Sequence, residues 1–79
     1  MKYQEIVKLY QWCKENGIIC TLETLFDGFK VTFIDGSDVV QHRYSYGSEQ
    51  GCVEPCGMEK SYTAVDMVTI KEILLKKFN

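Results

Sequence analysis

The chain has 79 residues, of which 46% are hydrophobic and 13% aromatic, and its formal net charge is −2. This length supports one domain, and the composition is that of a globular rather than a disordered protein. No apolar run reaches the roughly 18 residues that a membrane-spanning helix needs. The N-terminal stretch also lacks the continuous apolar core of a signal peptide. We therefore expect a cytoplasmic protein without membrane association.

The first predicted element is a helix over residues 3–16. Apolar residues from Ile6 to Cys13 fall on one arc at helical spacing, and Asn16-Gly17 ends the pattern, because glycine readily takes the left-handed conformation after a helix. Trp12 lies beside this arc. It either packs at the edge of the helix against a loop or forms an exposed aromatic anchor for a partner.

Three antiparallel strands are predicted next, over residues 18–26, 29–34 and 39–46, because apolar and polar residues alternate there. Asp27-Gly28 is typical of a two-residue hairpin turn, which places Phe26 opposite Phe29.

A four-residue turn over 35–38 then places Phe33 opposite Val40 and Phe29 opposite Tyr44. This register predicts one buried face: Leu22, Phe26, Phe29, Val31, Phe33, Val40 and Tyr44. It predicts an uncovered face with Glu23, Lys30, Thr32, Gln41 and Arg43.

The remainder of the chain is predicted as a long loop over 47–62 and a second helix over 64–78. Thr63 and Asp66 have the spacing of a capping box at the start of this helix. The expected fold is therefore α+β: an α-β-β-β-α two-layer sandwich with both helices on one face of a three-stranded antiparallel sheet. An exposed edge of the third strand could pair two copies into a homodimer.

The residues that could carry chemistry do not form a catalytic or cofactor pattern. His42, the only histidine, falls on the predicted inner row, where a packed imidazole is the favoured interpretation. Cys13, Cys20, Cys52 and Cys56 could suggest zinc, but their spacing favours packing as small apolar side chains. We expect neither an enzyme nor a protein that binds a cofactor or a metal.

Two resemblances follow from these elements. The α-β-β-β-α order resembles the double-stranded-RNA-binding domain in topology, but the second helix begins with Thr63-Ala64-Val65-Asp66 and has no basic start. The segments Asp27-Gly28-Phe29, Val40-x-His42 and Ser45-Tyr46-Gly47 resemble short proteins of phages and mobile elements in Firmicutes-type gut bacteria. This second resemblance implies an origin rather than an activity.

Most carboxylates gather in residues 21–59, where Lys30 and Arg43 are the only basic residues. An acidic surface of this kind suits a basic, nucleic-acid-binding protein as partner. The favoured function is a non-enzymatic, protein-binding accessory factor, for which inhibition of a host defence protein of the anti-CRISPR kind is one form. The candidate contacts are Trp12, Glu23, Lys30, Asp35, Asp38, Arg43, Glu49 and Glu54. The alternative is nucleic-acid binding through Lys71, Lys76 and Lys77.

Overall fold

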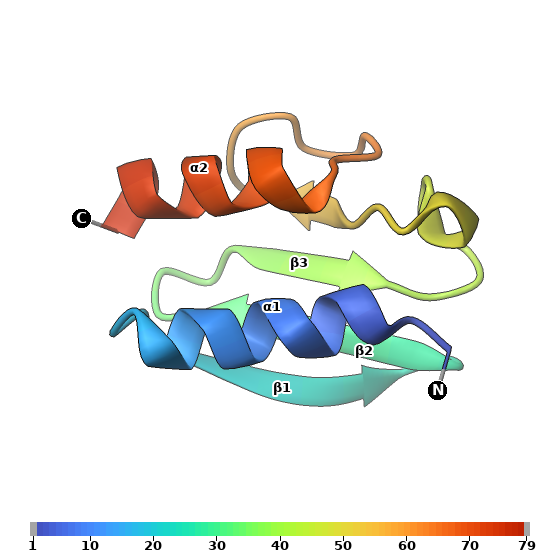
Figure 1. Ribbon diagram of the computed structural model, residues 1–79, viewed down its shortest axis with the longest axis horizontal. Coiled ribbons are helices and arrows are strands. Elements are labelled where there is room, and N and C mark those ends of the chain that lie inside the picture. Colours follow the sequence, from blue (N-terminus) through green and yellow to red (C-terminus); the bar gives the residue numbers. More distant parts are fainter. Residues whose placement is uncertain (1, 79) are drawn as a thin grey trace.

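Two helices and a four-stranded antiparallel sheet make up the computed structural model, which describes residues 2–78 (Figure 1). The elements in chain order are α1 (Gln4–Glu15), β1 (Cys20–Leu25), β2 (Gly28–Phe33), β3 (Asp38–Gln41), a 3-10 turn (Ser48–Gln50), β4 (Glu54–Cys56) and α2 (Met67–Phe78). The strands lie in the order β1-β2-β3-β4. The α+β class is confirmed, whereas the predicted count of three strands was wrong.

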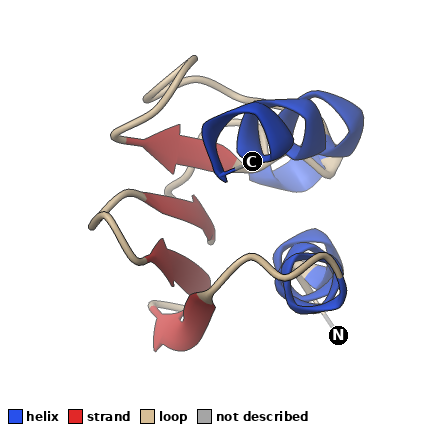
Figure 2. Cartoon of the chain, turned by 90° about the vertical axis from the view of Figure 1, so that its left-hand side faces the viewer, coloured by secondary structure: helices blue, strands red, loops and turns tan. Residues whose placement is uncertain are grey.

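The core lies between the sheet and the helices, which Figure 2 shows on the same side of the sheet. Val31, Phe33 and Val39 point from the sheet into this layer, and Ile6 meets them from α1. From α2, Phe78 stacks on Phe33 with ring centroids 5.1 Å apart. No helix in residues 2–78 is long and apolar enough to cross a membrane.

The β1–β2 turn differs from the prediction by one position. Leu25 pairs with Gly28, so the turn residues are Phe26 and Asp27 rather than Asp27 and Gly28. Gly28 is needed inside the strand instead, because a Cβ there would collide with the backbone carbonyl of Gln41. The pairing shifts by two residues, which leaves each side chain on its predicted face but places Phe26 in the turn, where it is 61% exposed.

The register between β2 and β3 differs more strongly from the prediction. Val31 pairs with Val39 and Phe29 with Gln41, a shift of three residues that exchanges the two faces of β3. Val39 and Gln41 therefore point inward, while Val40 points outward. The β2–β3 turn lies over 34–37, one residue earlier than predicted, and Gly36 adopts a φ of 88° there. The Asp35 carboxylate also accepts bonds from the backbone N–H and the hydroxyl of Ser37 there.

Gln41 is fully buried and connects α1 to the sheet through polar contacts. Its Oε1 accepts the backbone N–H of Ile6 at 3.0 Å, which satisfies one of the free donors at the start of α1. Its Nε2 donates to the carboxylate of Glu5 at 2.9 Å and to the carbonyl of Ser48 at 3.3 Å. The predicted placement of Gln41 on the uncovered face was wrong, because these partners make its burial favourable.

The predicted loop 47–62 contains β4, which pairs with β3 and places Pro55 opposite Val39. The third strand is therefore not an edge. The outer side of β4 is closed as well: the backbone of Tyr62 donates to the carbonyl of Pro55 at 2.9 Å, and Val53 and Val65 exchange two bonds of 2.8 Å.

Helix α2 begins at Met67, later than the predicted residue 64. Asp66, not Thr63, caps it, because the Asp66 carboxylate accepts the backbone N–H of Thr69 at 2.8 Å. Thr63 instead donates to the carbonyl of Lys60. The buried stripe of α2 consists of Ile70, Ile73 and Leu74, whereas the apolar Val68 is 71% exposed.

Candidate functional site

The side of the sheet opposite the helices, here called the open face, carries the outward side chains of all four strands. From the strand pairing these are Thr21, Glu23, Leu25, Lys30, Thr32, Asp38, Val40, Glu54 and Cys56. Glu23 lies directly opposite Lys30, as opposite charges across a strand pair should. The open face is therefore mainly polar, with Val40 near its centre.

Two carboxylates make the β3–β4 part of the open face acidic. Partial burial raises the pKa of Asp38; Lys30 opposes this shift, and Glu54 adds to it. Glu54 is fixed in place by the backbone N–H of Tyr46, which its Oε1 accepts at 2.9 Å. Two neighbouring carboxylates favour the approach of a further positive charge.

Four aromatic side chains lie around the open face and are more than half exposed. We call this group the aromatic rim: Phe26 (61%), Tyr44 (65%), Tyr46 (62%) and Tyr62 (63%). Phe26 contacts the Tyr44 ring edge-on with centroids 5.0 Å apart, and the guanidinium of Arg43 lies 4.9 Å from the centre of the Tyr44 ring. Tyr62 reaches the open face, where its hydroxyl accepts a bond from the Cys56 thiol at 3.1 Å.

Two members of the aromatic rim have an unfavourable backbone conformation. The φ of Phe26 is 55° and that of Tyr62 is 62°, in the region that favours glycine. Tyr3 also has a positive φ of 60°, but it is buried and donates to the Asp27 carboxylate at 3.2 Å. Phe26 and Tyr62 remain mostly exposed, so burial of their side chains offsets little of the cost of this backbone conformation.

The turn after β3 is built on His42 and Asp27. The backbone N–H of Tyr44 donates to Nδ1 of His42, and the Phe26 ring packs 4.9 Å from the imidazole. Asp27 accepts the backbone N–H of Arg43 at 2.9 Å, and this bond is the main cause that lowers the pKa of Asp27. His42 is buried, but at the end of β3 rather than on the predicted inner row. Its contacts position Phe26 and Tyr44 of the aromatic rim.

The four cysteines are all free, and they occupy two environments. Cys13 and Cys20 are buried next to one another, and burial raises the pKa of the Cys13 thiol to about 12. A thiol with so high a pKa is a poor nucleophile and a poor metal ligand. Cys52 and Cys56 are half-buried, and no group of three or more metal-binding side chains gathers within residues 2–78.

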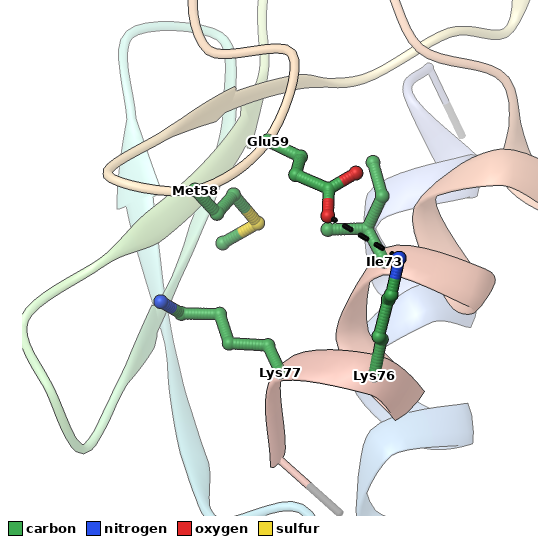
Figure 3. A pocket seen from close by; sticks show the side chains of 5 residues that line it. All are labelled: Met58, Glu59, Ile73, Lys76 and Lys77. Carbon is green, nitrogen blue, oxygen red and sulfur yellow. Dashed lines mark ion pairs between the residues drawn. The ribbon is translucent and has the colours of Figure 1, made fainter.

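A pocket of about 270 Å³ lies between α2 and the loop before it, lined by Met58, Glu59, Ile73, Lys76 and Lys77 (Figure 3). Its charged groups are already engaged. Lys76 lies 3.9 Å from Glu59, and Lys77 lies 2.9 Å from the carboxylate of Asp35. Lys71, the third lysine of the nucleic-acid alternative, lies over the Trp12 ring at 5.6 Å.

The predicted contact residues do not all belong to one surface. Glu23, Lys30, Asp38 and Glu54 share the open face, and Arg43 stands beside it in the turn after β3. Trp12 instead packs half-buried against the core. Asp35 is bound to Lys77, and Glu49 lies beside the start of α1 in a separate polar pocket.

Three of the four residues of the aromatic rim were missing from the predicted surface because alternation alone placed them on the inner face or in a strand. Tyr62, in the predicted loop, had no assigned role. The signal that could have separated them from the core is local: Tyr44, Tyr46 and Tyr62 stand among Gly, Ser and Thr residues that favour turns.

Comparison of the chain with models of protein families, with curated proteins and with solved structures finds no match.

Proposed function

We propose that this protein is a non-enzymatic binding module whose open face and aromatic rim dock on a partner protein. The observation that carries the proposal is the pair of exposed aromatics, Phe26 and Tyr62, held at positive φ. Each such backbone conformation costs about 1 kcal/mol or more. Strain of this kind without compensating burial is a feature of recognition sites, where a partner supplies the burial that the free protein lacks.

The composition of the surface supports a protein as the partner. Tyrosine, phenylalanine and arginine are the residue types enriched at the centres of protein interfaces, and the aromatic rim with Arg43 supplies them. The carboxylates of Asp38 and Glu54 beside the rim favour a partner with a basic surface. A nucleic-acid-binding protein of the host is such a partner. Together with the resemblance to phage and mobile-element proteins, this supports an accessory factor that inhibits a host defence protein.

The proposal can be tested by affinity capture with matched variants. The wild-type protein, the double variant Tyr44→Ser/Tyr62→Ser and the control Val68→Ser are used as baits in lysate of the native host, at low and at high salt. Val68 is as exposed as the rim residues but lies on α2. We expect a basic protein that wild type and Val68→Ser retain at low salt, and that is lost with the double variant and at high salt. No retained protein at low salt, or equal retention by the double variant, would contradict the proposal.

Nucleic-acid binding remains the second candidate function, and the lysines of α2 are the feature in its favour. Its weakness is that these lysines are engaged with Trp12, Glu59 and Asp35. A mobility-shift experiment with duplex RNA and duplex DNA separates the two functions. A shift at low salt that weakens steeply with added salt would favour nucleic acid, whereas we expect no shift.

A further inference from the structure

We propose that β1 pairs with β1 of a second copy of this chain, which joins the two sheets into one continuous sheet. The two edges of the sheet differ in how far they are covered. The outer side of β4 is closed by backbone bonds from Tyr62 and Val65. β1 is the other edge; it has six residues, with neither proline nor glycine, and it ends the strand order. An edge strand without proline or glycine has a row of free backbone N–H and C=O groups that can pair with another strand.

The backbone groups that would form this pairing can be identified from the β1–β2 hairpin. Leu25 and Gly28 close a two-residue turn, so this pair exchanges both of its backbone bonds. The direction in which the backbone N–H and C=O groups point alternates from one residue of the strand to the next. These groups therefore point toward β2 at Leu25, Glu23 and Thr21, and outward at Thr24, Leu22 and Cys20.

The side chains of β1 favour one register, with Leu22 opposite Leu22 of the second copy. In that register Glu23 faces Thr21 of the second copy, so the two Glu23 carboxylates are not opposed. Ile19, which is 71% exposed directly before β1, meets the half-buried Leu25 of the second copy. A shift by two residues in one direction would place Glu23 against Glu23, and a shift in the other would place Ile19 against Glu23.

The helices cover the inner side of β1 unevenly, and pairing in this register would bury the part that they leave open. Cys20 is buried, but Leu22 is only half-buried and Thr24 is exposed, so the helices leave this margin partly open. Pairing brings Leu22 of the two copies together there and extends both cores.

A second copy is favoured over a strand from another protein because β1 is complementary to itself in this register, with Leu22 opposite Leu22 and Ile19 opposite Leu25. The two edges of the sheet also differ. Only one edge can pair, so the assembly closes as a two-fold dimer and does not grow into a filament. Opposed residues share a face, so the helices of both copies lie on one side of the joined sheet and both open faces on the other. The dimer would present two open faces in the same direction, which favours a partner with repeated or two-fold sites.

The test is sedimentation velocity of the full chain from micromolar to millimolar concentration, with hydrogen exchange of individual amides. Wild type is expected to move from a mass of 9.1 kDa toward twice that value as concentration rises. Ile19→Lys should weaken dimerisation at least about tenfold, because it removes an apolar contact that occurs twice. Val68→Lys is the matched control: Val68 is also 71% exposed but lies on α2, and the variant should dimerise like wild type.

Hydrogen exchange identifies the surface that pairs. The amides of Leu22 and Thr24 should exchange slowly at millimolar concentration and rapidly at micromolar concentration, whereas those of Thr21 and Glu23 should be protected at both. A wild-type protein that stays monomeric at millimolar concentration would overturn the proposal. So would equal dimerisation of Ile19→Lys and Val68→Lys, or Leu22 and Thr24 amides that remain unprotected in a dimer.

Discussion

The two halves of the sheet are stabilised in different ways. The β1–β2 half is a regular hairpin whose inward row contains Val31 and Phe33, and its stability comes from apolar burial under the helices. The β3–β4 half has short strands, a buried glutamine and turns fixed by side-chain bonds. Tyr44, Tyr46 and Tyr62 of the aromatic rim follow β3 and β4 in the chain, whereas Phe26 lies in the β1–β2 turn. The difference indicates that the polar contacts of the second half shape a surface, whereas the first half provides the scaffold.

The largest expected effect is that of Gln41→Ala. The substitution leaves the backbone N–H of Ile6 and the carbonyl of Ser48 without their partner in a buried place. We expect a loss of about 3 kcal/mol in the free energy of unfolding, measured by urea denaturation. Gln11→Ala, at an exposed position of α1, is the control and should change stability by less than about 0.5 kcal/mol. Similar losses in both variants would show that the polar contacts of the second half contribute little.

A second substitution measures how much apolar burial in the β1–β2 half contributes to the free energy of unfolding. Val31 is completely buried beneath the helices. Val31→Ala removes apolar contacts only, and we expect a loss of about 2 kcal/mol in the same urea titration. A loss larger than that of Gln41→Ala would reverse the comparison, because apolar burial would then outweigh the polar contacts.

Tyr62→Asn tests whether the aromatic rim is strained. Asparagine tolerates a positive φ far better than tyrosine does, and Tyr62 is too exposed for its loss to remove much burial. We expect the free energy of unfolding to rise by about 0.5–1 kcal/mol while partner binding falls. Tyr46 is similarly exposed at an ordinary φ, so Tyr46→Asn should bring no gain in stability. A destabilised Tyr62→Asn variant would mean that the tyrosine serves the fold.

The smallest effect is the pH dependence that Asp35 contributes. Bonds from Ser37 and the Lys77 ammonium lower the pKa of this carboxyl in the folded state. A lowered pKa stabilises the fold fully above the ordinary aspartate value of about 3.9, and the contribution is lost as the pH falls toward the folded-state pKa.

Asp35→Asn should therefore flatten the decline of the melting temperature below about pH 4. Glu59→Gln, which removes only the exposed pair with Lys76, serves as the reference for a loose ion pair. An unchanged decline in Asp35→Asn would mean that other carboxyls, such as Asp27 and Asp66, control acid unfolding.

The two halves of the sheet also differ in how much of their structure the sequence pattern predicts. Alternation placed Leu22, Val31 and Phe33 on the correct face of the sheet, because apolar burial decides the first half. It failed at β3, where the apolar pattern favoured an inward row of Val40 and Tyr44.

The inward residue at that position is Gln41, whose burial depends on Glu5, Ile6 and Ser48. Those partners are remote in sequence from Gln41 or lie in the turn that follows it, so no local pattern could indicate them. Tyr44 and Tyr46 of the aromatic rim were missed for a different reason: alternation extended the predicted strand past Gln41, although the Ser and Gly residues beside the two tyrosines favour a turn. Glu23, Asp38 and Glu54 of the open face are among the predicted contacts, because charge pattern does not depend on register, but Asp38 was expected in a turn and Glu54 in the loop over 47–62.

The bond between Gln41 and the backbone of Ile6 joins residues 35 positions apart, and it sets an order for folding. Each strand pairs with its neighbour in the chain, so the sheet can grow from the β1–β2 hairpin by short steps. Helix α1 comes first in the sequence, but its first turn lacks the Gln41 hydrogen bond until β3 has joined the sheet. We expect pulse-labelled hydrogen exchange to find the amides of β1 and β2 protected before that of Ile6, and simultaneous protection would contradict this order.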